Sequence, residues 1–167
     1  MALVTRILDL DRESAALRRR GHGVIDVAAG RLVSVTLRPW PKFVSLAEAR
    51  IGGELFHRIW PGDRCWLYFN QPRAFPNFLV LKYTLTAADT TWETFSQALR
   101  TLDRIAAIKR SDALLCEASN HRISTRLLHR LGWEAHCPNS RRRNFIKRFS
   151  WPRPKYDAAL LADLQLA

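Results

Sequence analysis

The sequence predicts an α/β protein, in which a mixed β-sheet carries helices on its faces. In the second half of the chain, two short apolar runs alternate with two amphipathic helical patterns, and two further strand-like runs close the series. This order favours a sheet that contains a parallel pair, because a crossover helix returns the chain to the same end of the sheet. The 167 residues are 47% hydrophobic, which is enough for one core. We therefore predict a single domain over residues 1–167.

The first half of the chain alternates short helical and strand-like segments. Residues 11–20 predict a short helix, and residues 23–37 predict two strands about a glycine turn. Ser45 begins a capping box, the Ser-x-x-Glu pattern that starts a helix, and it predicts a helix over 45–51. Residues 65–70, CWLYFN, predict a strand between loops rich in Pro and Gly.

The second half gives the clearest pattern. Residues 78–86 are apolar, aromatic and β-branched, which predicts a buried strand. Thr90 begins another capping box, and apolar residues then recur every three or four positions, which predicts a helix over 91–110. Residues 113–118 form another apolar run. We predict that the two apolar strands are parallel neighbours joined by this helix.

A second helix and a hairpin complete the order. The helix is predicted to start from a cap at Ser119 or Asn120 and to stop at Gly132, which favours a left-handed backbone. Residues 133–149 then predict two strands, WEAHC and RNFIKRF, around the basic loop PNSRRR. The tail, 152–167, carries a short apolar pattern that predicts a further helix.

Residues 120–133, N-H-R-I-S-T-R-L-L-H-R-L-G-W, follow a glutamate-ended strand and resemble the second helix of the GNAT acyltransferase superfamily. Leu127, Gly132 and Trp133 match the family's Leu, Gly and aromatic positions. The resemblance covers about residues 75–149. It implies a GNAT-like fold and transfer of an acyl group to an amine from acetyl-CoA or a related acyl-CoA.

The cofactor loop departs from the family pattern. The family has a glycine-rich run there, whose backbone N–H groups hold the pyrophosphate at a helix N-terminus. This chain has T-A-A-D-T-T-W, where Asp89 would repel phosphate. The resemblance leaves Thr90, Thr91 and Asn120 as cofactor-binding candidates; the alternative role of Asn120 is the cap of its helix. We therefore expect weak binding of acetyl-CoA.

The catalytic position also departs from the family. The place of the family's general-acid tyrosine falls on Leu128, which cannot transfer a proton. Tyr83 and His129 are the candidate catalytic residues, because each carries a proton that can be exchanged. The alternatives are a half-buried strand tyrosine and an exposed helix histidine.

Cysteine and histidine spacing gives little support to metal chemistry. Cys65, Cys116 and Cys137 form no CxxC pair, and the histidines near Cys137 lack zinc-ligand spacing, so we predict no metal site. Unpaired thiols, no membrane-length apolar run and no secretory leader favour a cytoplasmic protein.

The net charge of +12 is the strongest feature of the composition. Residues 100–155 contain 14 Lys and Arg and 4 Asp and Glu. This excess of positive charge would attract a partner that carries phosphate groups. The alternative function is a non-catalytic GNAT-like module that binds nucleic acid or a ribonucleoprotein. The alternative interpretation is that these basic and aromatic residues belong to a hairpin with one face exposed to solvent. The candidate nucleic-acid contacts are Arg141, Arg142, Arg143, Lys147 and Arg148.

Overall fold

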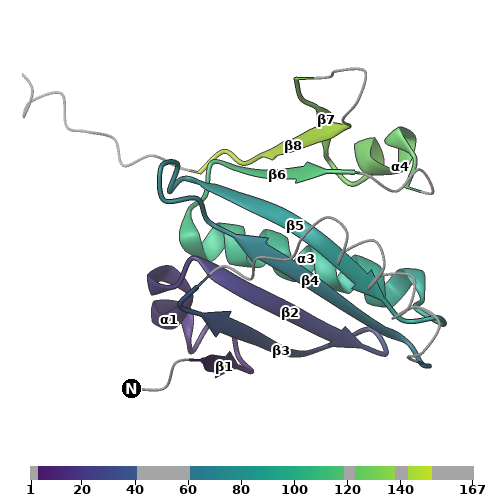
Figure 1. Cartoon of the computed structure of the whole chain (residues 1–167), viewed down its shortest axis with the longest axis horizontal. Helices are drawn as coiled ribbons and strands as arrows, with labels where there is room; N and C mark the ends of the chain where they lie inside the picture. Colours follow the sequence, from purple (N-terminus) through teal and green to yellow (C-terminus); the bar gives the residue numbers. More distant parts are fainter. Residues whose placement is uncertain (1–3, 41–60, 119–122, 138–142, 152–167) are drawn as a thin grey trace, which may run out of the picture.

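The computed structural model describes residues 4–40, 61–118, 123–137 and 143–151 (Figure 1). Its strands form one mixed sheet in the order β1-β3-β2-β4-β5-β6-β8-β7, with helices packed against it. This arrangement is consistent with a GNAT-like α/β fold; the extent of the domain along the chain stays a prediction. The strands are β1 (Thr5–Ile7), β2 (His22–Ala28), β3 (Arg31–Arg38), β4 (Arg64–Asn70), β5 (Phe78–Thr86), β6 (Ala113–Glu117), β7 (Glu134–Ala135) and β8 (Asn144–Arg148). The helices are α1 (Ser14–Arg19), α3 (Trp92–Lys109) and α4 (Thr125–Arg130).

The predicted parallel pair is confirmed. β5 and β6 pair in parallel from Phe78 opposite Ala113 to Leu81 opposite Cys116, and α3 connects them. The other pairings between described strands are antiparallel. The strand–helix–strand–helix–hairpin order expected for the second half is therefore present.

The hydrophobic core lies between α3 and one face of the sheet. β2 and β4 each turn alternate side chains toward the helix, as a period of two requires. Leu102 and Ile105 of α3 are fully buried against them, and α1 packs beside α3. Leu128 of α4 and Trp133 join the same core. The amphipathic pattern read from the sequence thus fixes which face of α3 is buried.

The turn predicted near Gly30 is a two-residue hairpin loop between β2 and β3. Ala29 and Gly30 have φ values of 47° and 72°. Positive φ at both positions matches the right-handed twist of the flanking strands, which is why glycine is favoured here.

Three sequence predictions about helix ends are wrong. Thr91 caps α3 in place of Thr90, and its hydroxyl accepts from the Thr94 amide at 3.2 Å. Ser124 caps α4, and its hydroxyl accepts from the Leu127 amide at 3.1 Å, so this helix starts later than predicted. α1 is shorter than residues 11–20. A turn formed around Asp9 occupies the preceding residues.

Some predictions lie outside the described residues. They concern the helix over 45–51, the caps Ser119 and Asn120, the loop around 138–142 and the tail 152–167.

One irregularity changes the direction of side chains along β5. Tyr68 of β4 lies opposite Tyr83, but the next residue, Phe69, lies opposite Leu81. Lys82 is therefore an extra residue, a β-bulge. Because side chains alternate with a period of two, the bulge places Tyr83 on the same face as Phe78, away from α3.

Candidate active site

β5 and β6 separate where the bulge begins. Their pairing ends at Leu81 and Cys116, whereas β5 continues to Thr86. A bulge bends its strand, so β5 turns away from β6 from Lys82 onward. In Figure 1, β6 diverges from the carboxyl end of β5. We call residues 82–86 of β5 and Glu117 of β6 the strand fork. In open α/β sheets, ligands bind outside the carboxyl ends of parallel strands.

Tyr83 lies at the strand fork and stacks on Tyr68. The two ring centroids are 4.0 Å apart, with an angle of 22° between the planes. The Tyr83 hydroxyl is buried and has no hydrogen-bond partner of good geometry among the described residues. Burial above all, and then the neighbouring Tyr68 phenol, raise the pKa of Tyr83 well above its usual value. The hydroxyl therefore stays protonated and can donate a hydrogen bond to a substrate.

His22 is a site residue that the sequence reasoning missed. It lies at the start of β2 and lines a cavity of about 10 Å³ together with Tyr83, Arg38 and Asn70. The His22 Nδ1 atom is also buried without a hydrogen-bond partner among the described residues. Two unpaired polar atoms thus border one cavity about as large as a water molecule. Only the strand register brings His22 and Tyr83 together, so no motif could have revealed the pair.

The N-terminus of α3 is occupied by a carboxylate of the chain itself. Asp63 accepts from the Thr91 amide at 2.8 Å, from the Thr91 hydroxyl at 3.0 Å and from the Thr94 hydroxyl at 2.7 Å. These bonds, the Thr91 amide first, hold the pKa of Asp63 below its usual value. Asp63 therefore fills the place where an anion would meet the helix.

The loop residues predicted to bind cofactor also have partners within the chain. The Thr90 hydroxyl donates to the Arg64 carbonyl at 2.7 Å and to the Ala87 carbonyl at 2.9 Å. Asp89 accepts from the Gly62 amide at 3.2 Å. A pyrophosphate at Thr90 and Thr91 would have to displace Asp63. The prediction of a cofactor site there stays a prediction.

Of the remaining residues suggested by the resemblance, the structure describes His129 and Leu128. His129 is exposed on α4, and no hydrogen bond links it to Tyr83 in the described part of the chain. Leu128, at the place of the family's tyrosine, is buried in the core. Asn120 lies outside the described residues.

The described basic residues of the C-terminal hairpin do not form one surface. Arg143 donates to the Ile123 carbonyl at 2.8 Å, and Lys147 pairs with Asp103 of α3 at 2.7 Å. Arg148 pairs with Glu134. Since Lys147 and Arg148 are consecutive in β8, they point to opposite faces of the sheet. Arg141 and Arg142 lie outside the described residues.

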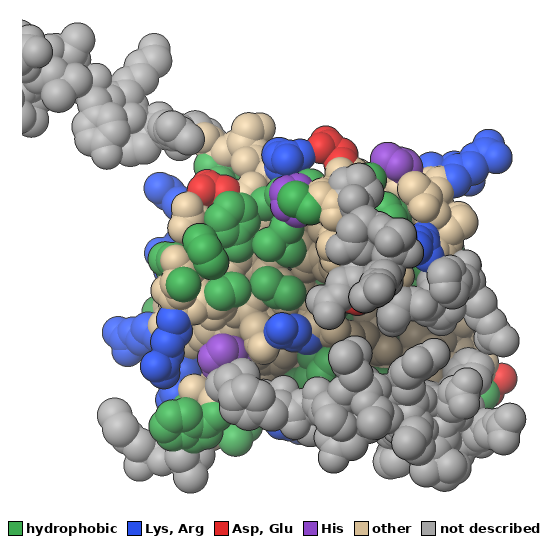
Figure 2. All heavy atoms as spheres, turned by 45° about the horizontal axis from the view of Figure 1, so that its top comes forward, with side chains coloured by type: hydrophobic (Ala, Val, Ile, Leu, Met, Phe, Trp, Pro, Cys, Tyr) green, Lys and Arg blue, Asp and Glu red, His purple; other side chains and the backbone are tan. Residues whose placement is uncertain are grey.

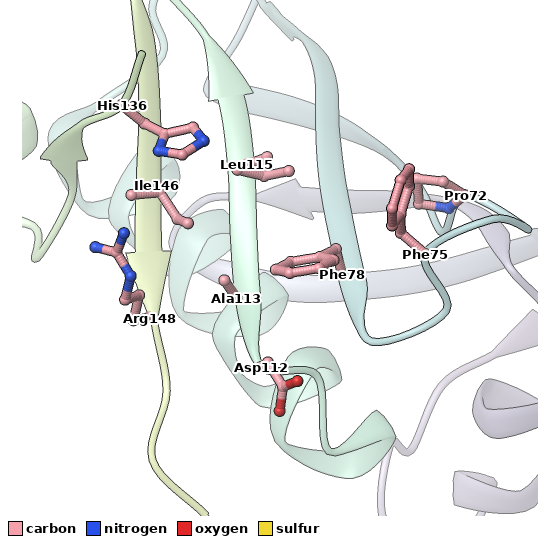
Figure 3. Close-up of a pocket in the computed structure, with 9 residues that line it drawn as sticks. All are labelled: Pro72, Phe75, Phe78, Asp112, Ala113, Leu115, His136, Ile146 and Arg148. Atoms are coloured by element: carbon pink, nitrogen blue, oxygen red, sulfur yellow. The ribbon is translucent and has the colours of Figure 1, made fainter.

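A larger pocket lies on the face of the sheet opposite α3, with a volume of about 540 Å³. Figure 2 shows hydrophobic side chains gathered on this face, and Figure 3 shows Phe78, Leu115 and Ile146 around a shared space. The described residues that line it are Pro72, Phe75, Phe78, Asp112, Ala113, Leu115, His136, Ile146 and Arg148.

Comparisons with known proteins identify no family. No family model matches the chain, and no curated protein matches it. The chain is similar to a solved structure of nourseothricin acetyltransferase, with 11% identity, a TM-score of 0.38, and coverage of 88% of this chain and 99% of the other.

None of the described helices has the length and apolar character needed to cross a membrane. No group of three or more His, Cys, Asp or Glu side chains gathers in the described ranges as metal ligands would.

Proposed function

We propose that the protein is a GNAT-like acyltransferase that moves an acyl group from an acyl-CoA thioester to an amine. The observation that carries this proposal is the strand fork, with Tyr83 on its open face. The bulge at Lys82 turns Tyr83 away from the core, and the β5–β6 pairing ends at the residue before it. A buried hydroxyl therefore lies where the two parallel strands stop pairing.

In this proposal the thioester lies along β5 in the strand fork, and the amine attacks its carbonyl carbon. A tetrahedral intermediate would form, and the C–S bond would break to release CoA. Tyr83, held protonated by burial, would donate a hydrogen bond to the reacting group. The amine must also lose a proton, and His22 across the small cavity or His129 on α4 could accept it.

Acetyl-CoA is the first candidate donor, with Thr90, Thr91 and Asn120 as its proposed contacts. The Asp63 carboxylate at α3 supports the expectation that its phosphates bind weakly. Positioning of the two substrates, and not strong binding of phosphate, would then supply most of the rate enhancement.

An acyl-transfer assay tests the proposal directly. Purified Cys137→Ser protein, which lacks the exposed thiol, is incubated with acetyl-CoA and a panel of primary amines. Release of free CoA that requires both substrates, and that falls on the order of 10²-fold or more in Tyr83→Phe, would support it. CoA release that is the same with and without amine, or the same in Tyr83→Phe, would refute it.

A further inference from the structure

The 540 Å³ pocket and the strand fork lie on the same face of the sheet. In the register, Phe78, Ala113 and Arg148 form one row across β5, β6 and β8, and Leu115 lies opposite Ile146 in the next row. Leu79 and Leu114, one residue further along their strands, are buried on the α3 side. The pocket residues therefore face away from α3, as Tyr83 does.

The pocket begins close to the strand fork. Leu115 lies two residues before Glu117, the end of β6 at the fork. A strand rises about 3.3 Å per residue, so the two positions are roughly 7 Å apart. A molecule at the fork that extends along β6 toward Leu115 would reach the nearest wall of the pocket.

The walls of the pocket are largely apolar, and its charged groups, Asp112 and Arg148, have partners within the chain. The remaining polar side chain of the described lining is His136, whose Nε2 lies 3.6 Å from the Cys137 Sγ atom. Asp112 accepts from the Asn77 amide nitrogen at 3.0 Å, and Arg148 pairs with Glu134. Phe75 leaves 61% of its surface exposed at the rim. The described lining thus offers little to a charged ligand. A volume of about 540 Å³ lies within the roughly 300–1,000 Å³ typical of small-molecule sites.

We propose that this pocket holds the apolar chain of one of the two substrates, so that the preferred substrate carries an alkyl or aromatic body and not a small polar group. The inference rests on the proposed acyl transfer. The apolar body could belong to the acyl chain of the thioester or to the amine, and both sources have the same chemistry. The pocket would place that body, and the fork would place the reacting bond.

Binding measurements separate the two sources. Octanoyl-CoA is compared with acetyl-CoA, and n-octylamine with ethylamine, while the methyl signals of Leu115 and Ile146 are followed by NMR. Each buried methylene contributes about 0.8 kcal/mol, which is about fourfold in affinity. With about three to four of the additional methylenes buried, we expect one long-chain probe to bind on the order of 100-fold more tightly than its short partner and to shift both methyl signals. Octanoyl-CoA would assign the pocket to the acyl chain, and n-octylamine would assign it to the acceptor.

Two variants and a control locate the binding. Leu115→Trp fills the pocket and should abolish the preference for the long chain. Phe75→Ala removes an exposed wall and should weaken it about tenfold with little change in stability. Leu8→Ala removes a side chain that is also exposed, 66%, but does not line the pocket, so it should change nothing.

The outcomes distinguish this inference from the proposed function. If acyl transfer is observed but neither long-chain probe is preferred, or the Leu115 and Ile146 methyls do not move, the pocket assignment is wrong. If n-octylamine binds at those methyls but no acyl transfer occurs with any donor, the pocket binds apolar chains as inferred and the transferase proposal fails.

Discussion

The Asp63 carboxylate accepts hydrogen bonds from both the amide and the hydroxyl of Thr91, at 2.8 and 3.0 Å. Within the described part of the chain, this carboxylate meets the N-terminus of α3, where the resemblance places the phosphates of a cofactor. The sequence directs attention to Asp89, which in the structure holds the Gly62 amide. Asp63 is therefore the sharper position at which to test cofactor binding.

Replacing Asp63 should improve the binding of acetyl-CoA. In Asp63→Asn the negative charge is removed from the helix N-terminus, so an anion is no longer repelled. A thermal-shift titration measures this. A ligand at about 100 times its dissociation constant adds about 2.7 kcal/mol, roughly 5–10 °C in melting temperature. We expect a shift of this size for Asp63→Asn at cofactor concentrations that leave the wild type unchanged. Asp89→Gly is the matched comparison, and an improvement confined to that variant would place the phosphate elsewhere.

The same carboxylate should stabilise the fold in a pH-dependent way. Its pKa is lowered in the folded protein from 3.8, so its contribution is present above pH 3.8 and is lost as pH falls through the folded value. The difference in melting temperature between wild type and Asp63→Asn should accordingly shrink below about pH 3.8. A difference that is the same at pH 7 and pH 3 would contradict this interpretation.

Removing the Tyr83 hydroxyl should separate stability from activity. Among the described residues the buried hydroxyl has no partner of good geometry beyond its contact with the Tyr68 phenol, so Tyr83→Phe should change the melting temperature little. Acyl transfer should fall on the order of 10²–10³-fold, the usual cost of removing a hydrogen-bond donor to the reacting group. Parallel melting and rate measurements decide the matter. A large loss of stability would show that the hydroxyl has a structural partner.

The three cysteines should react very differently with a thiol reagent. Burial, the largest cause, raises the pKa of Cys65 to about 12, and burial raises that of Cys116 to about 12 as well. Cys137 is exposed. Because the thiolate is the reactive form, the native protein at pH 8 should show one fast thiol, and Cys137→Ser none. The unfolded chain should show all three. Two fast thiols in the native wild type would mean that the β4 or β6 region opens readily.

The Lys109 amine should make the free energy of unfolding increase with pH between about pH 8 and pH 10.5. Its amine donates to the Arg20 carbonyl and the Gln71 side chain, and burial lowers its pKa from 10.5 to about 8. Between these values the unfolded chain binds the additional proton, so stability increases with pH. The cysteine and tyrosine titrations cancel in a comparison with Lys109→Met. The stability of the wild type relative to that variant should increase from about pH 8 to pH 10.5, as followed by urea unfolding.

Periodicity was sufficient to predict most of the sheet and the crossover helix. The apolar strands β5 and β6 and the amphipathic α3 each satisfy a local pattern that burial also favours, so sequence and structure agree. The cap of α3 was misassigned because Thr90 and Thr91 are adjacent and compete for one position. Thr91 wins over Thr90 since its hydroxyl reaches both Thr94 and Asp63.

The site was harder to predict for a physical reason. A bulge leaves no signature in the letters F-L-V-L-K-Y-T-L, so the face on which Tyr83 lies could not be derived from them. His22 and Asp63 come close to Tyr83 and Thr91, respectively, through contacts between segments far apart in the chain. Such long-range contacts carry no local pattern.

The parallel pairing of β5 with β6 lies between two groups of antiparallel strands in the sheet. On one side lie β1 to β5, which form an antiparallel meander-like unit packed on α3; on the other lie β6, β8 and β7. Among the described residues, four backbone-paired positions, from Phe78–Ala113 to Leu81–Cys116, join the two groups across the sheet. Core packing of Trp133 and the Lys147–Asp103 ion pair also tie the smaller group to the rest of the fold. We predict that the smaller group still opens more readily than the larger one. Amide hydrogen exchange would then release β6 and β8 together, ahead of β2 and β4, and the strand fork would lie at the hinge of that opening.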